Sequence, residues 1–236
     1  MTAHTLLPLV VLLSLSTPAV AEERRIGLGS FERVRVEGPY RVTIATGASP
    51  GATVRGAGGL DGVELRADGG TLVLRRAGGT DWAERRADAG GPVTVALTTP
   101  ALASVSASGG AEVSVTRMAA ARVDVALGGG GRIAVDTVTA DQLGVQLIGD
   151  GQIRIGAGKV AAARLTASGT GTIDAGGVDA GDAKVYLAGS GAITARARYT
   201  ATVSNAGLGT VSVAGQPKCR LIGQPAGTVT CGAGTR

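Results

Sequence analysis

Residues 149–155 read Gly-Asp-Gly-Gln-Ile-Arg-Ile, and this stretch decides the fold. Two glycines separated by one residue lead into two aliphatic residues that alternate with polar ones. Copies of the pattern recur through the C-terminal part of the chain, and the position of the second glycine falls at residues 111, 131, 151, 171, 191, 209 and 227. The first copy is looser and has Ala111 at that position. The steps between copies are therefore 20, 20, 20, 20, 18 and 18 residues. A nearly constant period of this length is typical of a solenoid.

Each copy also contains two segments with the two-residue periodicity of a β-strand. In the copy quoted above, Leu143, Val145 and Leu147 precede the glycines, and Ile153 and Ile155 follow them. Alternate residues of a strand point the same way, so these aliphatic side chains are expected to fill an interior. The glycines are expected to form a sharp corner, because glycine adopts a positive φ without strain and lets neighbouring backbones approach closely.

These features predict an all-β fold, a parallel β-helix or solenoid of about seven coils with 18–20 residues each. A coil of this length needs three short faces to return the chain to its start. Equivalent strands of successive coils are expected to stack about 4.8 Å apart. The outward positions carry small, polar side chains of mixed charge, so the solenoid is expected to present a flat polar surface.

The first 21 residues have the pattern of a secretory signal peptide. An apolar run from Leu6 to Leu15 ends before Pro18, and Ala19-Val20-Ala21 fits the rule for signal cleavage, which we expect after Ala21. The run is shorter than the roughly 20 residues of a membrane span, and no later stretch approaches that length. We therefore expect a periplasmic or secreted protein with no membrane span in its mature chain.

The mature chain, residues 22–236, is expected to form a single β-solenoid domain. Residues 100–231 carry the glycine repeats, and residues 31–99 form an N-terminal β segment in which Val34, Val36, Val42 and Ile44 alternate with other residues. A bare solenoid end exposes unpaired strand edges, so this segment is expected to cap or extend the coil.

The chain has two cysteines, Cys219 and Cys231, separated by 12 residues. Two cysteines in an exported protein usually form a disulfide. Both fall at inward positions of the last coil, so a bridge there is expected to pin the terminal coil. Two buried free thiols are the alternative.

Composition and motif spacing argue against several classes of function. The net charge is a mild +5 and aromatic residues make up only 2% of the chain, which is unlike a nucleic-acid binder that stacks bases. The glycine pairs precede strands rather than helices, so they are unlike a phosphate-binding loop. Asp136, Asp150 and Asp174 keep no common repeat position, which argues against a calcium ladder. We therefore expect no cofactor and no metal site.

The sequence offers little support for catalysis, and we assign no catalytic residue. Its one histidine, His4, lies in the predicted signal peptide. No two carboxylates are expected to stack in register, as glycoside hydrolysis would need. However, Asp174 is expected one coil from Arg154, and Arg164 one coil from Lys184, so a polysaccharide-active lyase or hydrolase is kept as an alternative.

A lone tryptophan, Trp82, lies between two glycine-bounded strands in the stretch Asp-Trp-Ala-Glu-Arg-Arg. It is interpreted as an anchor that holds its loop against the solenoid, with a contact residue for a partner as the other interpretation.

Several stretches resemble a known family. The segment Phe31-Glu-Arg-Val-Arg-Val-Glu-Gly-Pro-Tyr-Arg-Val-Thr-Ile, the serial Gly-x-Gly-x-Ile motif and the late Val213-Ala-Gly-Gln-Pro are similar to the putative auto-transporter adhesin, head GIN domain family. The resemblance covers roughly residues 31–231. It implies an exported bacterial β-helix-like domain, and it brings no catalytic residues.

We therefore expect a non-enzymatic, exported β-solenoid that acts as a binding or adhesion-like module of the bacterial cell envelope. Its expected partner is an envelope polysaccharide or another protein. The polysaccharide-active enzyme is one alternative, and a structural element that assembles through its ends into oligomers is the other.

Overall fold

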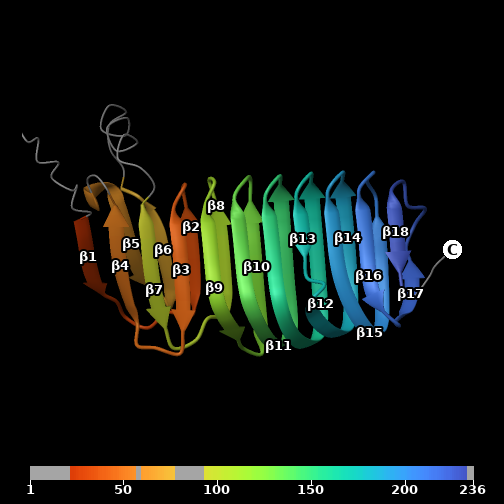
Figure 1. Ribbon diagram of the computed structural model, residues 1–236, viewed down its shortest axis with the longest axis horizontal. Coiled ribbons are helices and arrows are strands. Elements are labelled where there is room, and N and C mark those ends of the chain that lie inside the picture. The colour runs from red at the N-terminus through yellow and green to blue at the C-terminus, as the bar shows by residue number, and fades with distance from the viewer. Residues whose placement is uncertain (1–21, 57–59, 78–92, 233–236) are drawn as a thin grey trace, which may run out of the picture.

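A computed structural model describes residues 22–56, 60–77 and 93–232, so the predicted signal peptide and Trp82 lie outside the described residues. The described chain is nearly all β and forms a solenoid of about six turns, drawn as a straight stack of strands in Figure 1. The predicted fold class is confirmed, and the number of turns is close to the seven copies counted in the sequence. None of the described residues form a helix long and apolar enough to cross a membrane.

Each coil crosses three faces. We call the strand segment after each glycine turn face 1, the short segment that follows it face 2, and the segment before the next turn face 3. Strand β11 (Arg132–Gly149) covers all three faces. Its parallel ladder with β12 (Gln152–Gly169) is interrupted at Asp136 and Asp141, which leaves paired segments at 132–135, 137–140 and 142–149.

The parallel strands of faces 1 and 3 follow each other along the solenoid in register. In addition to β11 and β12, face 1 contains β7 (Thr94–Thr99), β3 (Arg41–Thr46), β9 (Glu112–Ala119), β13 (Thr172–Asp174), the start of β15 (Ala192–Asn205), β16 (Thr210–Gly215) and β18 (Thr228–Cys231). Face 3 contains β6 (Thr71–Arg76), β2 (Arg33–Glu37), β8 (Ser104–Ser108), β10 (Arg122–Gly128), the ends of β11, β12, β14 (Val178–Gly189) and β15, and then β17 (Lys218–Leu221).

The N-terminal segment both extends and caps the solenoid. Strand β2 pairs with β6 and β8, and β3 pairs with β7 and β9, so the coil made by residues 33–46 is inserted between two coils that come later in the chain. Beyond it, β4 (Gly51–Gly56) pairs antiparallel with β7, β1 (Glu22–Gly27) with β4, and β5 (Val63–Asp68) with β6. The short 3-10 turn η1 (Leu60–Gly62) precedes β5. The predicted capping is therefore achieved by antiparallel strands.

The glycine corners have two separate physical requirements. The first glycine adopts a left-handed conformation, as Gly169 does with φ +120°. The second needs space, because a Cβ on Gly171 would lie 2.4 Å from the carbonyl oxygen of Gly151 one coil earlier. The ladder continues through the corner, since the amide of Thr172 donates to that same oxygen at 3.0 Å. Each corner is thus stacked on the previous one.

The predicted aliphatic columns are buried along most of the solenoid, Ile153 completely. The last coil differs from the expectation on face 3: Cys219 and Leu221 are exposed, Leu221 by 47%. Strand β17 pairs with β15 on one side only, so its inward-pointing side chains are not covered by a following strand among the described residues. Asn205 replaces an aliphatic residue of the column and is buried because its amide donates to the Gly209 carbonyl and accepts from the Gly207 amide.

A disulfide joins Cys219 to Cys231 with Cα atoms 6.2 Å apart. It links β17 on face 3 to β18 on face 1 and so ties together two faces of the last coil. In the chain-entropy model a loop of this size contributes about 3 kcal/mol to stability.

Candidate functional site

A shallow groove crosses face 3 where one side chain is missing from an outward column. Asp124, Gly144, Arg164 and Lys184 occupy equivalent outward positions on β10, β11, β12 and β14. Gly144 contributes no side chain, and a hollow of about 300 Å³ is left around it. We call this hollow the basic groove; it is lined by Arg122, Gln142, Leu143, Gly144, Ala162, Ala163, Arg164, Asp182 and Lys184.

The charges around the basic groove are unequally satisfied. The Arg122 guanidinium donates two hydrogen bonds to the Asp124 carboxylate, at 2.8 and 3.0 Å, and this contact raises the pKa of Arg122. The Asp182 carboxylate accepts a hydrogen bond from the Thr200 hydroxyl. By contrast, Arg164 and Lys184 form no ion pair or side-chain hydrogen bond with another residue that the structure describes.

The two unengaged cations are neighbours. Arg164 pairs with Lys184 in the β12–β14 ladder, so their backbones are about 4.8 Å apart and their side chains leave the same face. Like charges on neighbouring strands repel each other, and water screens most of that repulsion at an exposed site. A bound anion would relieve it. The groove can therefore hold an acidic group without first breaking an existing ion pair.

One aromatic ring extends the site. Tyr186 lies two residues after Lys184 on β14, is 43% exposed, and is flanked by Thr166 and Ser204 on the adjacent strands. A tyrosine offers an apolar ring face together with a polar hydroxyl. The sequence analysis considered only the low aromatic content of the whole chain, 2%, and so missed this single ring. The available signal was a tyrosine at an outward strand position in a chain with very few aromatic residues.

The residues considered for catalysis do not come together. Arg154 and Asp174 are register neighbours as expected, but they lie on face 1. Arg164 and Lys184 are also neighbours, but on face 3. In the ladders of the described strands, no two carboxylates pair directly, and the described residues contain no cluster of three metal-ligating side chains. The geometry thus offers polar and cationic contacts rather than a carboxylate pair.

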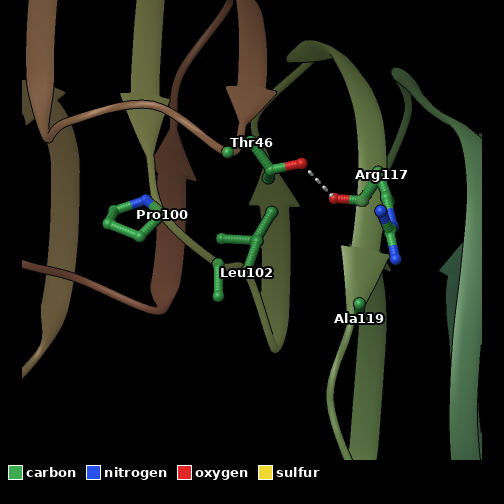
Figure 2. A pocket seen from close by; sticks show the side chains of 7 residues that line it. Thr46, Pro100, Leu102, Arg117 and Ala119 are labelled. Carbon is green, nitrogen blue, oxygen red and sulfur yellow. Dashed lines mark hydrogen bonds between the residues drawn. The ribbon is translucent and has the colours of Figure 1, made fainter.

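A second hollow of about 230 Å³ lies beside the segment that leads into β8 (Figure 2). Its walls come from Thr46, Pro100, Leu102, Arg117 and Ala119, among others. Figure 2 shows the Thr46 hydroxyl donating to the Arg117 carbonyl, a bond of 3.1 Å that ties the end of β3 to β9. Leu102 is completely buried, so this hollow is a dent over the core with one charged residue at its side. It offers fewer polar contacts than the basic groove.

Comparison with solved structures supports the fold. A putative adhesin from Bacteroides fragilis is 19% identical with a TM-score of 0.77, and the match covers 89% of this chain and 96% of that one. A putative adhesin from Parabacteroides merdae is 17% identical with a TM-score of 0.71, covering 89% and 95%. A putative lipid binding protein from Parabacteroides distasonis is 18% identical with a TM-score of 0.67, covering 91% and 95%. At these identities the likeness concerns the fold alone.

Comparison with curated proteins finds no match. The family model described as "Putative auto-transporter adhesin, head GIN domain" matches residues 30–217. This span includes the inserted coil, the glycine corners up to Gly209 and the whole basic groove. An adhesin-like family of this kind indicates an exported or envelope protein. The chain belongs to the putative auto-transporter adhesin, head GIN domain family.

Proposed function

We propose that this protein is a non-enzymatic binding module of the bacterial cell envelope, periplasmic or secreted, and that face 3 binds an envelope polysaccharide. The observation that carries the proposal is the exposed Tyr186 ring beside the open, polar basic groove. Membership of an adhesin-like family and the predicted signal peptide support export and binding.

The shape and chemistry of face 3 suit a sugar chain better than a compact ligand. Pockets for small molecules are usually concave and mostly apolar, with a few polar groups. The basic groove is shallow, and Gln142, Gln146 and Thr166 add amide and hydroxyl groups on the same strands. These groups can exchange hydrogen bonds with sugar hydroxyls, while the Tyr186 ring provides an apolar surface for a sugar ring.

The enzyme alternative has less support. Hydrolysis of a glycosidic bond ordinarily uses two carboxyl groups that flank the bond. On face 3, Asp124 is held by Arg122 and Asp182 by Thr200, and two strands separate them. Binding without turnover is therefore the function we assign.

Calorimetric titration of residues 22–236 against a panel of bacterial envelope polysaccharides tests the proposal. We expect a saturable heat with at least one of them and a weaker affinity in Tyr186→Ala. Tyr199→Ala is the matched control, because Tyr199 is 62% exposed but stacks under Arg198, whose guanidinium carbon is 5.3 Å from its ring centre. Equal losses in both variants, or no heat with any polysaccharide, would contradict the proposal, and a sustained heat rate would indicate turnover instead.

A further inference from the structure

We propose, building on the function above, that the polysaccharide is acidic and lies along the solenoid axis, across the strands of face 3. One carboxylate of the chain sits against Arg164 and Lys184, at the side of the Gly144 hollow that is away from Asp124. A later carboxylate meets Arg220 and Lys218 on the last coil.

The distribution of charge on the two large faces supports an acidic ligand. From β10 to β17, face 3 carries five cations at outward positions: Arg122, Arg164, Lys184, Lys218 and Arg220. Of these, Arg122 is the one that pairs with a carboxylate of a described residue. Asp124 and Asp182 offset two of these cations. Face 1 of the same coils is balanced, because Glu112 lies beside Arg132 and Asp174 beside Arg154 in the ladders. A polyanion is therefore attracted to face 3 rather than to face 1.

The positions of the cations favour one direction for the ligand. Arg164, Lys184, Thr202 and Arg220 follow one another at equivalent positions on β12, β14, β15 and β17. With about 4.8 Å per coil, the step from Lys184 to Arg220 is roughly 10 Å. A chain that ran along a strand would meet fewer cations: on β12 it would pass Arg164, Thr166 and Ser168. The axial path passes three cations, Arg164, Lys184 and Arg220, whereas a path along β17, the richest of these strands, passes two.

The Gly144 hollow marks the end of this path. The next outward residue of the column is Asp124, whose carboxylate would repel an acidic chain that continued further. The Asp124 carboxylate leans over Gly144, because a Cβ on Gly144 would lie 2.5 Å from one of its oxygens. The first carboxylate of the chain therefore sits on the other side of the hollow, against Arg164 and Lys184.

Tyr186 explains why a sugar acid fits better than an anion without a ring. Its ring lies on the same strand as Lys184, two residues further along, so it borders the path beside the first group of cations. A sugar unit that follows the first carboxylate would pass over this ring. Thr202 and Ser204 lie on the next strand and can exchange hydrogen bonds with its hydroxyls.

A length series of galacturonic acid oligomers tests both parts of the inference by calorimetry. We expect short oligomers to be weakened up to about fivefold by Arg164→Ala, the range for a single exposed charge contact, and to be unaffected by Arg220→Ala. Longer oligomers should bind more tightly, and they should then lose affinity in Arg220→Ala as well. Arg154→Ala removes the same charge from face 1 and should leave all affinities unchanged, and thermal melts verify that each exposed substitution keeps the fold.

The possible results separate the two proposals. If neutral oligomers bind equally well and Arg164→Ala does not change their affinity, the inference of an acidic ligand is wrong, while the proposed polysaccharide function remains. An Arg220→Ala effect that is equal at every length, or absent at every length, would overturn the axial path. Binding of no oligomer and of no envelope polysaccharide would overturn the proposed function itself.

Discussion

Replacing Gly171 with alanine should destabilise the solenoid through the stacking of its corners. The added Cβ would lie 2.4 Å from the Gly151 carbonyl oxygen and 2.7 Å from a methyl group of Leu147. The carbonyl cannot move away freely, because it accepts a hydrogen bond from the Thr172 amide. Overpacking of this kind costs about 1–3 kcal/mol, and we expect the upper end because the obstacle is backbone. For a domain of this size that corresponds to a fall in Tm of roughly 6–12 °C.

Gly130→Ala is the matched control. Gly130 is the middle residue of the corner Gly129-Gly130-Gly131, two copies before Gly171, and neither Gly130 nor Gly171 has a positive φ. A Cβ on Gly130 would have the Asp150 carboxylate 3.5 Å away as its nearest neighbour, an ordinary contact. We expect no loss, or a gain of up to about 1 kcal/mol from reduced freedom of the unfolded chain. Thermal unfolding followed by circular dichroism measures both variants, and equal Tm values for the two would refute the stacking argument.

Three further changes test the core, the N-terminal coil and the last coil. Ile153→Asp buries an unpaired charge in the middle of the solenoid and should abolish folding, so a soluble variant with unchanged melting would contradict the inward assignment. Burial raises the pKa of the Tyr40 phenol above its usual 10.0, and Arg76 partly offsets this rise. The folded state therefore favours the neutral phenol. The stability that this preference contributes is complete below about pH 10 and should be lost as the pH rises through the raised pKa. Tyr40→Phe should lose this alkaline dependence of Tm. Reduction of the Cys219–Cys231 bridge should lower stability by about 3 kcal/mol in urea unfolding, and identical curves with and without reductant would argue against it.

The solenoid could be predicted from the sequence because its physical requirements repeat. Each coil needs a glycine such as Gly169 for a positive φ, a glycine such as Gly171 for close approach, and aliphatic residues at alternate positions. A period of 18–20 residues is visible only when these local requirements recur in the same order. The inward columns and the corners followed directly from that pattern.

Other features could not be read from the sequence because they depend on pairing between distant segments. The coil of residues 33–46 carries the same alternation as other coils, and nothing in it indicates insertion between β6 and β8. The exposure of Cys219 follows from which strands cover β17, while its position in the repeat equals that of buried residues. The basic groove depends on Gly144, an irregular glycine at an outward position, and on register neighbours that bring Arg164 beside Lys184.

The most direct test of the central claim is to map the ligand on the protein by NMR. Amide shifts of isotope-labelled residues 22–236 would be followed during titration with a galacturonic acid oligomer. The account predicts that the largest changes fall on the face 3 segments 142–148, 162–168 and 182–188. Changes confined to face 1, on segments 132–135, 152–155 and 172–174, would contradict the account.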